Sequence, residues 1–156
     1  MNNERNKRIL VIAYGNPYRN DDGVAHYIAE SVQEWANEEK ISKITIITTY
    51  QLDIDMAEDI SEADNVYFLD AHITDYSPNV VIEKVEPKKT NGFTTHVFTP
   101  SDLIALAEQL YGKSARGMLI SVPGHNFDMG EELTNDTRKQ ADYAAKKLKE
   151  MIMKKV

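Results

Sequence analysis

Residues 8–23 read RILVIAYGNPYRNDDG, an apolar run followed by a polar turn that carries two consecutive aspartates. A run of this length without polar alternation is typical of a strand that is covered on both faces, as in a parallel sheet. Gly15-Asn16-Pro17 breaks the run, so the sequence predicts a strand over Arg8–Tyr14. We therefore expect this strand to lie in the centre of a parallel sheet.

Strand-like and helical patterns alternate along the rest of the chain. The sequence predicts further strands at Lys43–Thr49, Asn65–Leu69, Asn79–Val85 and Gly117–Val122, and helices at about Gly23–Asn37, Leu52–Ala63, Pro100–Leu110 and Asn135–Met153. The 79–85 run alternates and is more polar, as expected near a sheet edge. Such alternation implies βαβ units. We expect one α/β domain over residues 1–156, with a mostly parallel, five-stranded twisted sheet and helices on both faces.

The composition excludes several classes of protein and partner. The 156 residues are 42% hydrophobic and 28% charged, which suits a globular domain and not a disordered chain. The formal net charge of −7 repels phosphate backbones and anionic lipids, so we expect neither nucleic acid nor a membrane surface as a partner. There is no cysteine, which excludes disulfides and a thiol nucleophile. No run approaches the roughly 20 apolar residues of a membrane helix, and we expect a cytoplasmic protein.

Polar residues gather where the predicted strands end. Asp22 follows the first strand, Asp70 follows the third, and His96 precedes the helix at residues 100–110. In parallel sheets, ligands bind in the crevice outside the carboxyl ends of the strands. Two carboxylates and one imidazole could hold a divalent cation such as nickel, zinc or manganese, or could carry out general acid–base hydrolysis without a metal. The spacing does not separate these two chemistries.

The turn around Asp22 is expected to be rigid and to support that residue. Its supporting members are Gly15, Asn16, Asp21 and Gly23. The two glycines have the wrong separation for a P-loop or a dinucleotide fingerprint, which argues against phosphate binding. Asp21 or Asp22 could cap the helix that follows, but only one of them can do so.

Each candidate also has a plain structural interpretation. Asp70 could be a turn residue that bonds its own backbone, and His96 could be an ordinary polar loop residue. His72 lies two residues after Asp70 and would point to the same side of a continuing strand, so it is the rival of His96 as a ligand. His26 lies off the apolar face of its helix, and we expect it to face solvent.

Four motifs together resemble one known family. GNPYRNDDGVA at residues 15–25 resembles the G-N-x-L-x-x-D-[DE]-G-x-G signature of the hydrogenase-maturation endopeptidases. In the same order as in that family follow FLDA at 68–71, THVFTPSDL at 95–103 and FDMGEELT at 127–134. The chain departs from the signature at Ala25, where glycine is usual, and at Tyr18, where leucine is common.

The resemblance implies a function, a partner and a ligand set. Members of the family remove the C-terminal extension of the large-subunit precursor of nickel–iron hydrogenases, as peptidases grouped with the aspartic type. By position, Asp22, Asp70 and His96 would bind the nickel of that precursor, which favours His96 over His72. The nickel would then come with the substrate, although another divalent cation could occupy the site. The resemblance also implies a twisted five-stranded sheet of the phosphorylase/hydrolase-like kind, and we expect a monomer.

Two alternatives follow from the same residues. The first is a metal-dependent amidase or peptidase that acts on a different substrate. The second is a non-catalytic chaperone that checks the nickel content of the hydrogenase precursor without cleaving it.

Overall fold

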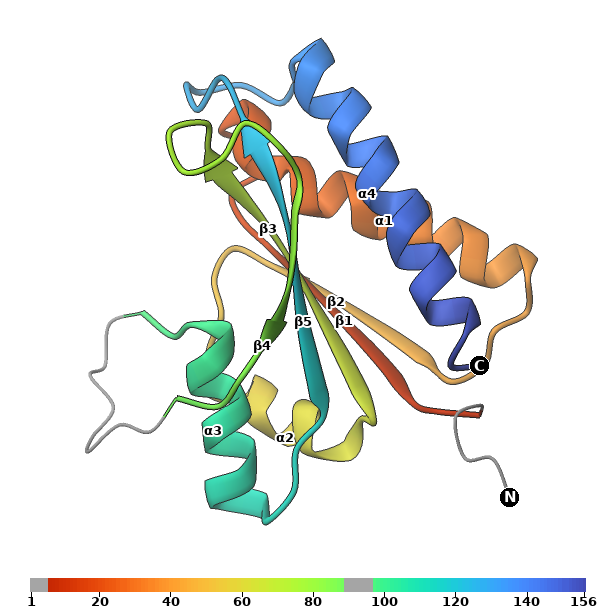
Figure 1. Ribbon diagram of the computed structural model, residues 1–156. Coiled ribbons are helices and arrows are strands. Elements are labelled where there is room, and N and C mark those ends of the chain that lie inside the picture. Colours follow the sequence, from red (N-terminus) through yellow and green to blue (C-terminus); the bar gives the residue numbers. More distant parts are fainter. Residues whose placement is uncertain (1–5, 89–96) are drawn as a thin grey trace.

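A five-stranded sheet with the strand order β2-β1-β3-β5-β4 runs through the middle of the computed structural model, which describes residues 6–88 and 97–156 (Figure 1). The strands are β1 (Ile9–Tyr14), β2 (Ile44–Thr49), β3 (Asn65–Ile73), β4 (Val81–Val85) and β5 (Arg116–Gly124). All neighbouring strands are parallel except β4, which pairs antiparallel with β5 at one edge. The predicted α/β class, the mostly parallel sheet and the polar edge strand are confirmed.

Helices cover both faces of this sheet. A 3₁₀ turn, η1 (Asn20–Gly23), leads into α1 (Val24–Glu38), and the other helices are α2 (Met56–Glu62), α3 (Pro100–Tyr111) and α4 (Asn135–Met153). Figure 1 shows α1 and α4 on one side of the strands and α2 and α3 on the other. None of the helices in the described part of the chain is long and apolar enough to cross a membrane.

Alternation along each central strand divides the core into two clusters. In β1, Val11 packs toward α1 and α4, whereas Ile12 packs toward α2 and α3. In β3, Leu69 packs toward α1 and α4 and Phe68 toward α2 and α3. All four of these side chains are fully buried. Because successive side chains point to opposite faces of a strand, even-numbered residues of β1 and β3 share the α2/α3 face. Tyr14 and Asp70 lie on that face by the same alternation.

Local capping fixes the start and end of α3. The Thr99 side chain accepts a hydrogen bond from the Asp102 N–H, and the Asp102 carboxylate accepts one from the Thr99 N–H. Pro100 occupies the first turn, and Gly112 ends the helix in the left-handed conformation, with φ of 75°. These are the signals from which the helix was predicted.

Two predicted boundaries were wrong by four residues, and β4 and β5 each differ from the prediction by two residues at one end. The helix expected from Leu52 begins only at Met56, because the Asp53 side chain accepts a hydrogen bond from the Asp55 N–H and forms a turn there. The third strand does not end before Asp70 but continues to Ile73, because β5 pairs with it over its whole length. Asp70 is therefore a strand residue and not a turn residue.

Candidate functional site

The loop from Gly15 to Gly23 brings the backbone of Asp22 back against the end of β1. Gly15 has φ of +141°, and a Cβ added there would collide with the carbonyl oxygen of Asp22. A Cβ at Gly23 would come within 2.7 Å of the Pro17 Cα. Both positions therefore require glycine, and the tight turn expected from the sequence is what these glycines permit.

Asp22 does not cap α1. One oxygen of its carboxylate, Oδ2, accepts a hydrogen bond from the Asn16 N–H at 2.8 Å. The Asn16 side chain in turn accepts a bond from the Tyr18 N–H at 2.9 Å. The N-cap position of α1 is Gly23, and no side chain bonds to the helix start. The expectation that Asp21 or Asp22 caps this helix is therefore wrong, because the 3₁₀ turn intervenes.

Asp70 lies at the carboxyl end of the sheet beside Tyr14. Its Oδ1 accepts a hydrogen bond from the Ala71 N–H at 2.7 Å. Burial raises the pKa of Asp70 to about 6, and the nearby charge of Asp22 adds to the rise, whereas the Ala71 N–H and the neighbouring Tyr14 hydroxyl oppose it. Burial also raises the pKa of Tyr14, with a further contribution from the Asp70 charge. The fold thus brings Asp22 and Asp70 close enough for their charges to repel.

His72, the rival ligand, has both ring nitrogens engaged by protein groups. Its Nε2 lies 3.0 Å from the Ser77 carbonyl oxygen, and its Nδ1 lies 2.6 Å from the Ser121 Oγ. A carbonyl only accepts, so Nε2 carries the proton and Nδ1 accepts from the serine hydroxyl. No ring lone pair is left for a cation in this arrangement.

His26 does not face solvent as expected. It is half-buried, and its Nε2 lies 2.9 Å from the Gly15 carbonyl oxygen and 3.2 Å from that of Thr49. These carbonyls end β1 and β2, so the imidazole links α1 to both strands. The prediction failed because the helical periodicity of α1 does not reveal the loop that folds back over this face.

Asp21 is the residue whose role the sequence did not reveal. Its side chain is fully buried and accepts hydrogen bonds from the N–H groups of His125, Asn126 and Thr134, at 2.7, 3.0 and 2.7 Å. The hydroxyls of Thr134 and Thr137 donate to it at 2.8 and 3.0 Å. Burial alone would raise the pKa of Asp21, but these donors outweigh it and lower the pKa. Asp21 thus fastens η1, and with it Asp22, to the loop between β5 and α4.

The third predicted ligand, His96, lies outside the described residues. Within residues 6–88 and 97–156, no three His, Asp or Glu side chains are grouped so that they could hold a metal ion. The described part of the site therefore consists of the Asp22 and Asp70 carboxylates, with Tyr14 beside them. Two carboxylates at one edge of the sheet suit a role as ligands of a divalent cation or in proton transfer.

Comparison with solved structures identifies the fold. A [NiFe] hydrogenase maturation protease, HycI from Thermococcus kodakarensis, superposes with a TM-score of 0.71 at 19% identity, over 94% of this chain and 93% of that one. The chain has the fold of the hydrogenase maturation proteases. The maturating endopeptidase HybD from E. coli gives a TM-score of 0.69 at 17% identity, over 90% of this chain and 89% of HybD.

A third neighbour extends the likeness across organisms. The hydrogenase 2 maturation peptidase of a Thaumarchaeota archaeon has a TM-score of 0.66 at 16% identity, over 94% of this chain and 98% of the peptidase. No family model and no curated protein matches the sequence itself. With identities of 19% or less, the likeness to these three proteins is one of fold.

Proposed function

We propose that this chain is a site-specific endopeptidase that removes the C-terminal extension of a nickel–iron hydrogenase large-subunit precursor after nickel insertion. The observation that carries the proposal is that Asp22 and Asp70 lie at the same carboxyl edge of the sheet, Asp22 against the end of β1 and Asp70 on the neighbouring β3, in a fold that maturation proteases share. Four sequence motifs in family order add support. The reaction would take place in the cytoplasm, with the precursor as protein partner.

The electrostatics of the two carboxylates favour a cation brought by the substrate. Asp70 is partly desolvated and feels the charge of Asp22, which raises its pKa to about 6. A divalent cation between the two carboxylates would remove this repulsion. Nickel accepts imidazole as a ligand readily, so His96 would complete the donor set. The nickel belongs to the precursor and is therefore part of the substrate.

The protein groups around the carboxylates set their roles. Asn16 holds one oxygen of Asp22 through its N–H, and Ala71 holds one oxygen of Asp70 in the same way. These bonds orient both groups before the substrate arrives. A carboxylate in this position can accept a proton from an attacking water, while a bound cation can polarise a carbonyl. The chain has no cysteine, so a thioester intermediate on a thiol is excluded.

Intact-mass measurement after incubation with precursor tests the proposal. The parent protein is expected to shorten nickel-loaded precursor by its C-terminal extension and to leave nickel-free precursor intact. Shortening of both forms would instead indicate a peptidase that does not require the metal. A stable complex without shortening would indicate a nickel-checking chaperone.

Variants then assign the activity to the site. Asp22→Asn and His96→Ala are expected to reduce cleavage at least a hundredfold, because each removes one group from the metal-binding set. Asp136→Asn is the matched control, since Asp136 is an exposed aspartate in the first turn of α4, and it should cleave like the parent. Normal processing by Asp22→Asn and His96→Ala would refute the assignment.

A further inference from the structure

Three large side chains with apolar surface are exposed on loops at the carboxyl edge of the sheet, the edge that carries Asp22. They are Tyr18, Tyr50 and Met129, with exposed fractions of 49%, 57% and 78%. They come from three separate loops, each of which leaves the carboxyl end of a strand: β1, β2 and β5. We call these three residues the apolar patch. Apolar side chains that gather on a surface mark a site where another molecule binds.

Short contacts link the loops that carry the apolar patch to one another and to the site. The rings of Tyr18 and Tyr50 meet edge to face, with centroids 6.5 Å apart. The Gly130 N–H donates to the Tyr18 carbonyl oxygen at 2.9 Å, which brings the neighbouring Met129 to the same loop. Tyr18 and Asp22 are linked in turn through Asn16, which bonds both of them. The apolar patch therefore adjoins the candidate site.

Acidic side chains outnumber basic ones in the segments that carry the apolar patch, where Arg19 is the one Lys or Arg within five residues of its members. The exposed carboxylates within five residues of its members are Asp53, Asp55, Asp128, Glu131 and Glu132. Among residues 6–88 and 97–156, the one ion pair is Lys147–Glu150, so none of these five carboxylates is paired with a cation there. Unpaired charges of one sign around an apolar surface favour a partner with the opposite charge.

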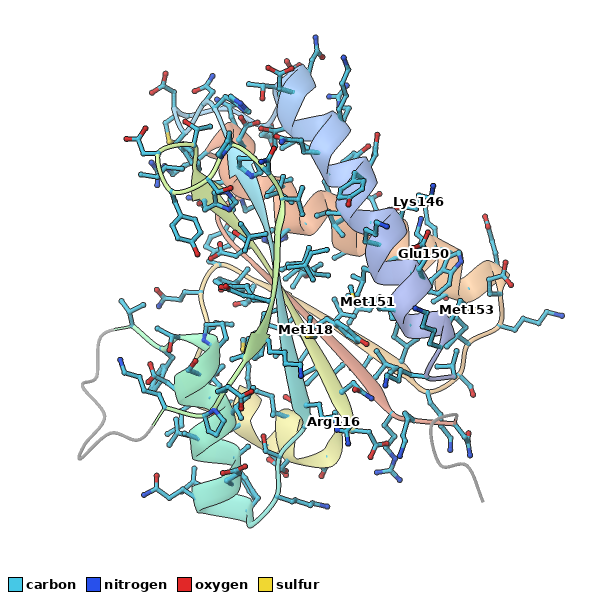
Figure 2. The ribbon with its side chains drawn as sticks, viewed as in Figure 1. Arg116, Met118, Lys146, Glu150, Met151 and Met153 are labelled. Atoms are coloured by element: carbon cyan, nitrogen blue, oxygen red, sulfur yellow. The ribbon has the colours of Figure 1, made fainter. Side chains whose placement is uncertain are left out.

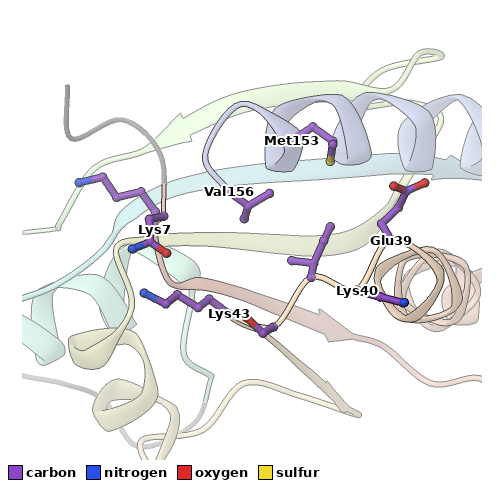
Figure 3. Close-up of a pocket in the computed structure, with 9 residues that line it drawn as sticks. Lys7, Glu39, Lys40, Lys43, Met153 and Val156 are labelled. Carbon is purple, nitrogen blue, oxygen red and sulfur yellow. The ribbon is translucent and has the colours of Figure 1, made fainter.

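Three basic side chains lie at the opposite end of the sheet, whereas the exposed Arg19 lies next to Tyr18, where its side chain donates to the Phe127 carbonyl oxygen. Lys7 and Lys43 line a pocket of about 320 Å³ where β1 and β2 begin (Figure 3). Arg116 occupies the first position of β5, again at the amino end (Figure 2). Glu39 lines the same pocket as Lys7 and Lys43, so the far end carries both signs of charge. Beside the apolar patch, five exposed carboxylates stand against the single cation Arg19, and this local negative charge favours a basic partner.

We propose that the apolar patch binds a segment of the hydrogenase precursor that presents apolar side chains flanked by lysine or arginine. This inference rests on the proposed function and names the substrate surface that the enzyme recognises. The apolar side chains would cover Tyr18, Tyr50 and Met129, and the basic residues would face the surrounding carboxylates. Binding there holds the precursor beside Asp22 while contributing nothing to the bond-breaking step, so it affects KM and not kcat.

Steady-state kinetics with nickel-loaded precursor tests the inference. The double variant Tyr50→Ser/Met129→Ser removes two exposed members and is expected to raise KM about tenfold, with kcat within about twofold of the parent. The matched control is Tyr111→Ser/Met153→Ser, which changes the same residue types at 46% and 47% exposure. Tyr111 is the last residue of α3, just before the start of β5, and Met153 is the last residue of α4 (Figure 2), so both lie away from the apolar patch. The control is expected to keep the parent's KM.

Each other outcome overturns a defined claim. If the parent shortens the precursor and both double variants share its KM, the inference fails and the proposed function stands. If the parent leaves the nickel-loaded precursor intact, the proposed function fails and the inference falls with it. If the parent sediments as a dimer and Tyr50→Ser/Met129→Ser as a monomer, the apolar patch is an interface between copies of the chain and the inference is refuted.

Discussion

Replacing Asp21 with alanine should destabilise the protein severely, although Asp21 is not a proposed ligand. The carboxylate accepts three N–H bonds, from His125, Asn126 and Thr134, inside a site without solvent access. Alanine leaves those three N–H groups without an acceptor, and each unsatisfied buried donor costs about 1–3 kcal/mol. The Thr137 hydroxyl, which also donates to Asp21, does not lose its partner in the variant. It lies 3.0 Å from the Pro123 carbonyl oxygen and can bond there instead. We expect a loss of at least about 3 kcal/mol in the free energy of unfolding.

Asp21→Asn should cost less, which makes it the informative partner variant. Oδ1 of Asp21 accepts only from the Thr134 N–H, and the other four donors converge on Oδ2. An asparagine can place its oxygen at the crowded position, so a single N–H then meets the amide NH₂ group. The loss of one hydrogen bond and the gain of one repulsive contact should lower the free energy of unfolding by about 1–3 kcal/mol.

Urea unfolding of the parent and the two variants measures these differences. Asp22→Ala is the control, because it removes one acceptor for a single N–H in the same turn. The lowered pKa of Asp21 also fixes the pH dependence. Its ionised form stabilises the fold above the ordinary carboxyl pKa of 3.8, and that stabilisation is lost as the pH falls through the lower folded-state value. An Asp21→Ala variant as stable at pH 7 as Asp22→Ala would refute this account.

Three further changes have defined outcomes. Asp70→Asn should abolish cleavage but raise the free energy of unfolding at pH 8 by about 3 kcal/mol, because a pKa of about 6 means that the folded state disfavours the ionised carboxyl. This penalty is absent at pH 3 and full above pH 6, which pH-dependent urea unfolding checks. In the parent, kcat/KM should fall about tenfold per pH unit below pH 6, because protonated Asp70 no longer holds a cation. A flat pH–rate profile between pH 5 and pH 7 would contradict this. Lys40 follows α1 at φ of 57°, a conformation that costs residues other than glycine about 1 kcal/mol. Lys40→Gly should therefore raise the free energy of unfolding by about 1 kcal/mol, whereas Lys40→Ala should not, and thermal unfolding distinguishes the two.

Local signals predicted the elements whose causes are local. The bounds of α4 were predicted as Asn135–Met153 and are found there, because Thr134 accepts a hydrogen bond from the Thr137 N–H at the helix start and an apolar stripe follows. β1 was predicted from an apolar run that is buried on both faces, and the structure agrees to within one residue. For these elements the residues that decide the structure lie within the element or next to it.

Long-range contacts account for what the sequence did not reveal. The donors to Asp21 lie more than 100 positions away along the chain, so no local pattern distinguishes its role from that of Asp22. β3 extends past Asp70 because its neighbour β5 continues to Gly124, and a strand's own residues do not encode its neighbour's length. The candidate site was found from strand-end positions and motif order, whereas the hydrogen bonds that orient it required the fold.

The extension of β3 past Asp70 has an evolutionary consequence. Asp70 and the three residues that follow it are held by the ladder to β5, so Asp70 does not depend on the connection between β3 and β4 for its position. That connection, residues 74–80, can change in length or sequence without moving the Asp70 carboxylate. Such a change would remove the hydrogen bond between His72 and the Ser77 carbonyl oxygen. Chains with this fold can therefore vary the surface beside the candidate site without moving Asp70.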